Sequence, residues 1–480
     1  MNWQPDTSSH IPLFKQIIQY IENGIVTGHM FPGERLPSER ELASKWGINR
    51  STVNLAYAEL RATGLIKSVQ GSGTKVSEDL WGITPRRSPN WKDYVNGGLF
   101  LPNQPVAQRV KELLRDESYI NLASSELAEE LIPVAWMDQL LKQISLKHAV
   151  QYGEPGGDRG LRETIADHMQ AEHKVEVQPE QILITSGIQQ AFNLIIQCLL
   201  SPGDAIALER PSFMYSRTIF TASGLRLYPI PVDDYGIRPE EIRKLHSHHK
   251  LRMIFVNPTY QHPTGTTLPA DRRRKLLEIA EELRIPIIED DPYSLLTLGG
   301  SPAAPPSLLA MHNGGDFVIY LGTLSKIAAP GLRIGWMVAP KSVVERLTAA
   351  KEQMDFSTSA LSQQLAKAYL SSPEWKGRLQ IITRQLTRRR DIMLDALTKY
   401  MPRGSKWIIP EGGYYLWVKL PFKVSDSRLV EECIRHRVLL YPGTVYGAIS
   451  NQIRLVYSRA SEEELGEGIR RLSLALQSSL

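Results

Sequence analysis

The sequence predicts a multidomain protein in which a small helical unit ending in a β-hairpin precedes a much larger α/β body. The chain has 480 residues, more than one ordinary domain contains. Residues 10–76 show three short segments of helical periodicity before a glycine-centred hairpin. From about residue 118 to the end, short apolar strands alternate with amphipathic helices, a pattern typical of a mostly parallel sheet covered on both faces.

Residues 77–117 lie between these parts and are expected to form a linker, because prolines and glycines recur in them. The segment also holds four aromatic residues, namely Trp81, Trp91, Tyr94 and Phe100. A free linker rarely carries so many aromatics, so we expect part of it to pack on a neighbouring surface.

The composition is that of an ordinary globular protein, with 42% hydrophobic and 22% charged residues. The two cysteines, Cys198 and Cys433, have no spacing that favours pairing, so we expect a reducing, cytoplasmic location. There is no signal-peptide pattern and no apolar run of roughly 18 residues, so no membrane span is expected. The net charge of +5 permits nucleic-acid binding without demonstrating it.

The first helix of the N-terminal unit is predicted from apolar residues at helical spacing, Leu13, Ile17, Ile18, Ile21 and Ile25. Ser38 followed by Glu41 forms a capping-box pattern that predicts the start of a second helix, which stops at Gly47. Asn49 is expected to cap a third helix that runs to Gly64. Two short strands, 65–69 and 74–76, then flank a glycine turn.

Two helices joined by a tight turn and followed by a hairpin predict a winged helix-turn-helix. In this motif the second of the two helices enters the major groove of DNA. That helix begins with Asn49, Arg50, Ser51 and Thr52, side chains suited to base edges and phosphates. A simpler interpretation is that Asn49 only caps the helix and Arg50 is a solvated surface charge. The charge of residues 1–76, eight Lys/Arg against six Asp/Glu, does not decide between them.

Three segments, 12–17, 33–43 and 49–53, together with the wing 70–74, closely resemble the DNA-binding domain of the bacterial GntR family. The resemblance covers nearly all of residues 10–76. It implies that double-stranded DNA is a partner, with Arg35 helping at the backbone. The residues it places against DNA are Arg40, Asn49, Arg50, Ser51, Thr52, Gln70 and Gly71.

In the body, five apolar segments are predicted as strands: 182–184, 205–208, 253–256, 285–288 and 317–321. Binding sites in such sheets form at the carboxyl ends of the strands. Lys326 follows the last of these strands, with hydroxyls just before it and Arg333 seven residues after it. A lysine of this kind, with an acid, an aromatic ring and a phosphate cup, is the set that pyridoxal 5′-phosphate requires.

Asp290 ends its strand and Tyr293 follows three residues later, so the acid could pair with the ring nitrogen and the phenol with the ring oxygen. Because Glu289 and Asp291 flank it, the acid could be assigned wrongly by one position. The cluster could also merely cap a helix. Ser186-Gly187-Ile188 opens a helix after a strand, which suits a phosphate.

Asn257 follows another strand and could hold the ring oxygen, or could be a turn residue before proline. Phe213 could stack on the ring, with Tyr215 as a rival, although either could belong to the core. Arg454 lies in a strand-like apolar setting where its charge needs a partner. That partner could be a substrate carboxylate or the acid of a buried structural salt bridge.

From about residue 118 to the end, these motifs resemble the fold-type I aminotransferases of class I/II, which have a smaller C-terminal α+β subdomain. The resemblance implies that Lys326 forms the internal aldimine, that Asp290 holds the ring nitrogen, and that Arg454 grips the α-carboxylate. It further implies ring-oxygen contacts from Asn257 and Tyr293, stacking by Phe213, and phosphate contacts from Ser186, Gly187, Ile188, Ser325 and Arg333. Tyr152 matches a tyrosine that reaches the partner subunit's phosphate, which implies a homodimer.

A departure from the family pattern occurs at the stacking position, where relatives usually have tyrosine and this chain has Phe213. The expected domains are 10–76 for DNA binding, 77–117 for the linker and 118–480 for the cofactor body.

A GntR head joined to an aminotransferase-like body resembles the MocR subfamily of transcriptional regulators. The resemblance implies a regulator that senses an amine, an amino acid or the cofactor itself. The alternatives are an active aminotransferase that carries a DNA-binding head, and a body used only for dimerisation.

Overall fold

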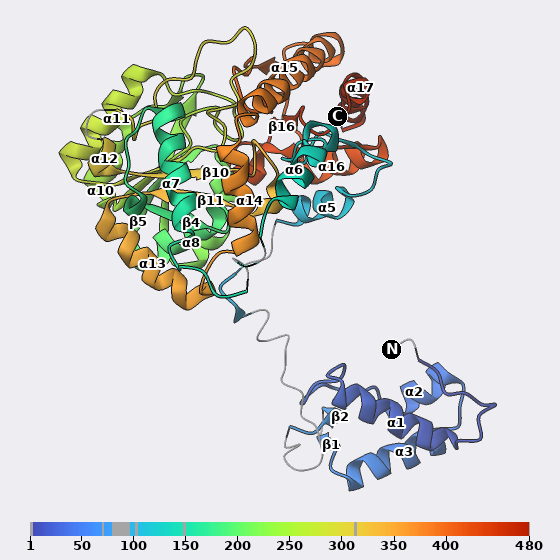
Figure 1. The fold of residues 1–480 in the computed structure, drawn as a ribbon. Coiled ribbons are helices and arrows are strands. Elements are labelled where there is room, and N and C mark those ends of the chain that lie inside the picture. Colours follow the sequence, from blue (N-terminus) through green and yellow to red (C-terminus); the bar gives the residue numbers. More distant parts are fainter. Residues whose placement is uncertain are drawn as a thin grey trace. The chain divides into compact units, whose positions relative to one another are not determined.

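The computed structural model describes residues 3–69, 72–78, 97–100, 104–145, 147, 150–311 and 314–479 (Figure 1). It divides into two compact units, residues 1–99 and 100–480. We call the first unit the head and the second the body, and each is described by itself.

The described part of the head contains three helices and a hairpin, as the sequence predicts. Their bounds are α1 (Leu13–Val26), α2 (Glu39–Trp46), α3 (Arg50–Ala62), β1 (Ile66–Val69) and β2 (Gly73–Val76). Ser38 and Glu41 form the predicted capping box at the start of α2. The Asn49 side chain accepts a hydrogen bond of 3.0 Å from the Ser51 amide and so caps α3.

The head has its own core, built from the apolar faces of the three helices and the inner side of the hairpin. Val53, Tyr57 and Leu60 of α3 are completely buried against Ile17 and Ile21 of α1. Gly47 ends α2 in the left-handed conformation, at φ 65°, which a glycine adopts without steric cost. The winged helix-turn-helix prediction is confirmed.

The body is built around an eight-stranded sheet, counted among the described residues, with the order β4-β11-β10-β9-β8-β5-β6-β7. The central strands β10, β9, β8, β5 and β6 run parallel, whereas β11 and β7 are antiparallel to their neighbours. The strands are β4 (Ile182–Thr185), β5 (Ala205–Arg210), β6 (Arg226–Asp233), β7 (Gly236–Ile237), β8 (Met253–Val256), β9 (Ile287–Asp290), β10 (Val318–Thr323) and β11 (Gly335–Val338).

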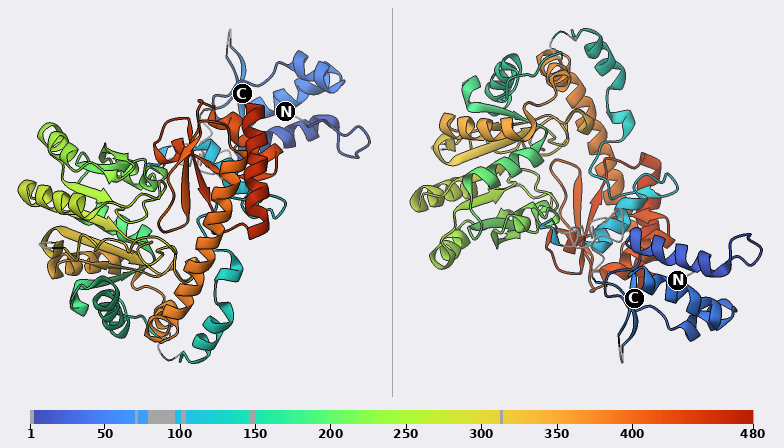
Figure 2. Two further views of the ribbon diagram at one scale, coloured as in Figure 1. Left: turned by 90° about the horizontal axis from the view of Figure 1, so that it is seen from above. Right: turned by 90° about the horizontal axis from the view of Figure 1, so that it is seen from below.

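Helices cover both faces of this sheet, because the central strands are apolar on both sides (Figure 2). In β8, Ile254 and Val256 belong to one hydrophobic core, and Met253 and Phe255 belong to the other. The first core includes residues of α7 (Arg159–His168), α10 (Glu240–His249) and α11 (Ala270–Leu283). The second includes residues of α8 (Ile188–Leu199) and α13 (Lys341–Asp355).

The remaining helices of the body include α15 and α17, which lie side by side in its smaller C-terminal part (Figure 2). Their bounds are α6 (Val134–Lys142), α9 (Ile219–Ala222), α12 (Gly314–Phe317), α14 (Ala360–Ser371), α15 (Trp375–Tyr400), α16 (Asp426–Arg435) and α17 (Glu462–Ser479). A four-stranded antiparallel sheet has the order β12-β13-β16-β15, and β14 pairs with β3. These strands are β3 (Ile120–Asn121), β12 (Lys406–Trp407), β13 (Tyr415–Lys419), β14 (Val438–Leu439), β15 (Tyr441–Pro442) and β16 (Gln452–Val456).

The segment expected to be a linker contains a helix, α5 (Pro105–Leu113). Its Val110 is buried in a small cluster with Ala123 and Val430 of the body. Of the four aromatic residues in that segment, Phe100 is exposed, and Trp81, Trp91 and Tyr94 lie outside the described residues. Among the helices that are described, none is long and apolar enough to cross a membrane.

Candidate functional site

The carboxyl ends of the central strands surround a cavity of about 610 Å³ in the body. Chain segments from several elements meet there because parallel strands end at the same edge of a sheet. The structure brings together eight of the residues singled out from the sequence as cavity-lining residues: Ile188, Phe213, Asp290, Tyr293, Ser325, Lys326, Arg333 and Arg454.

Lys326 and Arg454 converge on a single residue, Ser125. The ammonium group of Lys326 donates to the Ser125 carbonyl at 2.8 Å, and Arg454 Nη1 donates to the Ser125 hydroxyl at 2.9 Å. Tyr414 also donates to the Ser125 carbonyl, at 3.1 Å. Lys326, the candidate to lie beside a ligand amine, and Arg454, the candidate to bind a ligand carboxylate, therefore both contact Ser125.

Arg454 is a buried guanidinium that lacks an acidic partner within the described residues. It is 2% exposed and lies near the rings of Tyr415, Tyr441 and Tyr446. Among the described residues, its hydrogen-bond partners besides Ser125 are the Ala123 carbonyl and His262, and none is present for its Nε. The buried salt bridge, one of the two interpretations that the sequence left open, is not formed with any residue that the structure describes.

Asp290 is the acid of its cluster that faces the cavity. It is 1% exposed, and its Oδ1 has no hydrogen-bond partner among the described groups. Burial raises the pKa of Asp290 well above its usual range; Asp291 and Glu209 add to this, and Lys326 opposes it. A protonated ring nitrogen would supply the missing partner.

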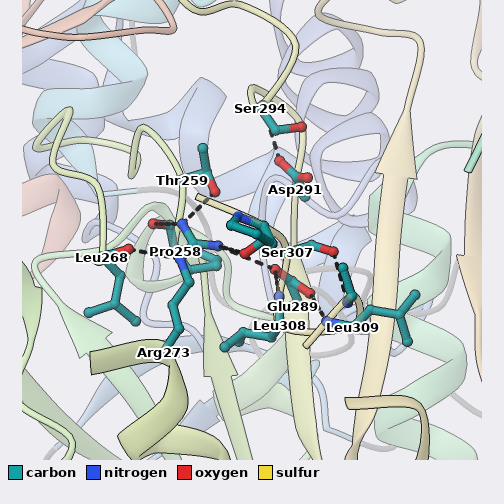
Figure 3. A network of polar contacts seen from close by, with 12 residues as sticks. Pro258, Thr259, Leu268, Arg273, Glu289, Asp291, Ser294, Ser307, Leu308 and Leu309 are labelled. Carbon is teal, nitrogen blue, oxygen red and sulfur yellow. Dashed lines mark hydrogen bonds and ion pairs between the residues drawn. The ribbon is translucent and has the colours of Figure 1, made fainter. Parts of the chain in front are cut away.

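The two neighbouring acids have other partners, which separates their roles from that of Asp290 (Figure 3). Glu289 accepts from the amides of Leu308 and Leu309, at 2.8 and 3.0 Å, and lies 3.9 Å from the fully buried Arg273. Asp291 accepts from Tyr320 and from the Ser294 amide. Side chains alternate along a strand, so these contacts leave only Asp290 directed to the cavity.

The phosphate-cup candidates lie at the start of α8 and in the segment after β10. Arg333 Nη2 donates to the Ser186 carbonyl at 3.0 Å, and Gly187 has φ 84° and ψ 170°, a conformation essentially restricted to glycine. A Cβ on Gly187 would lie 2.4 Å from Arg333 Nη2. Ser186 and Gly187 are not cavity-lining residues themselves, and the Ser186 amide donates to Gln190.

Phe213 forms one end of a stack of three rings. Its ring is parallel to that of His262 at 5.6 Å, and His262 is parallel to Tyr415 at 4.0 Å. Burial, together with Arg454, Lys326 and Arg217, holds the pKa of His262 well below its ordinary value. The imidazole is therefore neutral, and its Nε2 accepts the 3.0 Å hydrogen bond from Arg454.

The structure does not place Asn257 among the cavity-lining residues, and its contact with a ring oxygen stays a prediction. The carboxamide is fully buried, donates to the Asp290 carbonyl at 2.6 Å and accepts from the His262 amide at 2.7 Å. These bonds fix the turn that carries His262, and the Asn257 Nδ2 has a second hydrogen besides the one that it donates to the Asp290 carbonyl. It is His262 that lines the cavity.

Tyr293 lines the cavity and shares a hydrogen bond of 2.8 Å with the hydroxyl of Tyr415. Tyr152 is not a lining residue: it is 84% exposed and stacks on Phe356 at 5.2 Å. Within one chain, then, Tyr152 is separate from the site.

In the head, the exposed start of α3 carries Arg50 and Ser51, whereas Thr52 is half-buried. Arg40 of α2 is also exposed, and neither Arg40 nor Arg50 has a side-chain partner in the described part of the chain. Arg35 forms a β-bridge with Lys75 of the wing, and its guanidinium lies against Gly73. Gln70 and Gly71 lie outside the described residues.

Sequence reasoning missed several lining residues, among them Lys111, Ser125, Gln189, Arg217 and Tyr446. Most come from segments with no recognisable motif. His262 had a signal, because it lies in the turn after a strand, but the same turn offered Asn257.

The residues present fit pyridoxal 5′-phosphate. A lysine, an aromatic ring, an arginine and a buried acid whose Oδ1 has no partner among the described groups line one cavity, and Gly187 lies beside that arginine; this is the donor set that the cofactor requires. Fold and site together define a cofactor-dependent body of the aminotransferase type, and the head is a DNA-binding module.

Comparisons with known proteins support this class. The family described as "Aminotransferase class I and II" matches residues 117–472, and "Bacterial regulatory proteins, gntR family" matches residues 13–76. The chain belongs to the aminotransferase class I and II family and carries a GntR-type DNA-binding domain, the MocR-like architecture.

Relatives of both kinds are similar to it. An uncharacterised helix-turn-helix transcriptional regulator of Bacillus subtilis, YisV, is 36% identical over 98% of this chain and 96% of its own length. The aromatic-amino-acid aminotransferase 1 of Thermococcus litoralis is 34% identical over 78% of this chain and 92% of its own length.

A solved structure of Pyrococcus horikoshii kynurenine aminotransferase, in complex with pyridoxamine phosphate, has a TM-score of 0.74 and 32% identity. The match covers 79% of this chain and 96% of that one. The protein is thus a transcriptional regulator with a pyridoxal 5′-phosphate-dependent, aminotransferase-like domain.

Proposed function

We propose that the body senses an α-amino acid through bound pyridoxal 5′-phosphate and thereby alters DNA binding by the head. The observation that carries the proposal is the convergence of Lys326 and Arg454 on Ser125. An α-amino acid carries its amine and its carboxylate on one carbon. A ligand of that geometry could replace Ser125 as partner of both side chains.

The unpartnered charge of Arg454 supports this ligand class. A buried guanidinium costs free energy unless it is paired, and neither a carboxylate nor a phosphate from the described part of the chain pairs with it. A ligand carboxylate could form charge-assisted, bidentate hydrogen bonds with it. The aromatic rings around Arg454 would exclude water from that pair.

The cofactor would be held by the groups that surround the cavity. Lys326 is the residue proposed to bond it covalently, Asp290 to hold its ring nitrogen protonated, and Phe213 to stack on the ring. Ser325, Arg333 and the start of α8, with Ser186, Gly187 and Ile188, are the proposed phosphate contacts. When bound, the cofactor supplies a carbonyl carbon that exchanges amines and a ring that withdraws electrons.

For the ring oxygen, we propose the hydroxyl of Tyr293. Asn257, which also fixes the turn that carries His262, is proposed as a second contact of the ring oxygen through the remaining hydrogen of its Nδ2.

The same contacts suggest how ligand binding could change the structure outside the cavity. Ser125 belongs to the segment 121–126, whose Asn121 donates to the Leu114 carbonyl just after α5. A ligand that takes Lys326 and Arg454 releases Ser125, and so loosens a segment attached to α5. α5 follows the linker in the chain, so loosening this segment would favour a second arrangement of α5 and the linker. The ligand would then have different affinities for the two arrangements, and regulation requires such a difference.

We also propose that the protein is a homodimer. Tyr152 and Phe356 form an exposed aromatic pair, and Val150 beside them is 76% exposed. Apolar groups gathered on a surface in this way are typical of protein interfaces. A dimer would place two heads on DNA, with Arg35, Arg40, Asn49, Arg50, Ser51 and Thr52, and the wing residues Gln70 and Gly71, as the proposed contacts.

The experiment is a titration of the full chain, loaded with pyridoxal 5′-phosphate, with a panel of amino acids, followed by visible absorbance and by DNA affinity. One amino acid should shift the absorbance and change DNA affinity at the same concentration. Lys326→Ala should remove both responses, and Lys341→Ala, on the exposed start of α13, should keep both.

A DNA response that persists in Lys326→Ala would contradict the proposal. Equally, an absorbance that no amino acid shifts would refute amino-acid sensing at this cavity.

The second candidate function is transamination, favoured by the presence of lysine, acid and arginine in one cavity. Sustained conversion of an amino acid and a 2-keto acid would support it. Spectral change without turnover would leave sensing as the function.

A further inference from the structure

Two cations in the cavity lining have no role in holding the cofactor or an α-carboxylate. They are Lys111, on α5, and Arg217, which follows the short 3-10 helix Phe213–Ser216. They come from different parts of the chain, and both line the same cavity as Lys326 and Arg454.

Neither cation is paired within the described residues. Both side chains are exposed to the cavity side of the surface, and no hydrogen bond or ion pair from the described part of the chain reaches the Lys111 ammonium or the Arg217 guanidinium. The acid nearest to Lys111 along α5, Glu112, already contacts Arg109 and Gln108. A cation that only solubilises a surface needs no cavity, whereas these two face one.

The electrostatics places Arg217 close to Arg454. Burial raises the pKa of Tyr441, and the positive charges of Arg454 and Arg217 both oppose this rise. The same two arginines act together on the pKa of Tyr446 and on that of His262. Arg217 therefore lies within electrostatic reach of the proposed α-carboxylate site.

Among the described residues, the cavity has more cationic than acidic lining residues. Its lining contains two acids, Asp290 and Glu126. Asp290 is allotted to the ring nitrogen, and the cofactor phosphate and the α-carboxylate are allotted to Arg333 and Arg454. Lys111 and Arg217 are then the lining cations to which neither the cofactor nor the α-carboxylate is allotted.

We propose that the effector is an α-amino acid with a second acidic group on its side chain, and that Lys111 and Arg217 bind this distal group. The inference rests on the proposed function and names the chemical class of its ligand. A distal carboxylate forms charge-assisted hydrogen bonds with both cations, whereas the matching amide is neutral and its NH₂ group would face two donors. The distal group would also connect the ligand to α5, the helix that follows the linker.

The test uses the full chain loaded with pyridoxal 5′-phosphate, with L-glutamate and L-2-aminoadipate as acidic probes. L-glutamine and L-norvaline are the neutral probes, because they match glutamate in length. Binding is followed by calorimetry and by the visible absorbance of the bound cofactor. We expect the acidic probes to bind at least tenfold more tightly than the neutral ones.

Arg217→Gln and Lys111→Gln should each reduce this preference by roughly tenfold and leave the affinity for L-norvaline unchanged, because its side chain carries no charge. Arg238→Gln and Lys341→Gln remove the same charges from exposed positions outside the cavity lining, and they should retain the preference.

The outcomes separate the two proposals. If neutral and acidic amino acids bind equally, or if both cavity variants keep the parent's preference, the inference is overturned and amino-acid sensing stands. If no amino acid releases heat or shifts the absorbance, the proposed function fails and the inference fails with it.

Discussion

Replacing Gly187 by alanine should weaken cofactor binding in addition to destabilising the fold. At φ 84° and ψ 170°, an alanine costs about 1–3 kcal/mol of backbone strain. The added Cβ would also lie 2.4 Å from Arg333 Nη2 and 3.1 Å from its Cζ, so the guanidinium must move. Arg333 would then lose its 3.0 Å hydrogen bond to the Ser186 carbonyl and its place at the phosphate cup.

A charge-assisted hydrogen bond contributes about 1.5–3 kcal/mol, so pyridoxal 5′-phosphate affinity should fall roughly 10- to 100-fold. The assay is a titration of the cofactor-free protein followed by absorbance, with urea unfolding measured in parallel. Gly203→Ala is the matched control, because Gly203 also has a positive φ, 91°, but a Cβ there meets nothing within 4 Å.

The control should lose a comparable amount of stability and keep its cofactor affinity. If Gly187→Ala binds the cofactor as tightly as the parent, or if both variants lose affinity equally, the assignment of Gly187 and Arg333 to the phosphate cup is refuted.

Three further predictions concern other parts of the chain. Burial raises the pKa of Glu209 to about 7, so the body should lose stability as the pH rises from about 4.5 through 7. Glu209→Gln should remove that loss, which is worth about 3 kcal/mol at pH 8. Urea unfolding of both proteins at pH 5 and 8 measures it, and a variant less stable than the parent at pH 8 would contradict the prediction. Ser38→Ala removes the α2 cap and should destabilise the head by about 1 kcal/mol with unchanged cofactor binding, whereas Ser44→Ala, inside α2, should not destabilise the head. Equal melting temperatures of the head in the two variants would argue against this role of Ser38. Arg50→Ala should weaken DNA binding roughly tenfold, since a good base contact contributes about 1–3 kcal/mol, and should leave the visible absorbance unchanged. The affinity is measured on DNA that the parent protein selects from a random pool, and an undiminished affinity would exclude Arg50 from the interface.

Local patterns were sufficient for the elements. The capping box at Ser38 and Glu41 and the cap at Asn49 depend on residues two or three positions apart, and both form as predicted. The strand predicted at 253–256 is β8 itself, because a short apolar run buried on both faces has few other conformations. The strand predicted from Ile285 begins at Ile287 instead, after Pro286, which lacks the amide hydrogen that a strand needs.

The partners of the site's side chains could not be predicted in the same way. That Asp290 faces the cavity while Glu289 and Asp291 are occupied elsewhere depends on Arg273, Leu308 and Tyr320, all distant in the sequence. That Asn257 fixes the turn that carries His262 depends on its hydrogen bonds to the Asp290 carbonyl and to the His262 amide.

The sequence by itself determined the two-part organisation, the secondary structure of the head, and the lysine, acid and arginine of the site, because motifs and periodicity are local properties of the chain. Only the tertiary structure decided that Arg454 lacks an acidic partner in the described part of the chain, that Ser125 contacts both it and Lys326, and that Lys111 and Arg217 line the same cavity. The reason is physical: burial and charge balance depend on which distant segments pack together, and no spacing along the chain encodes that directly.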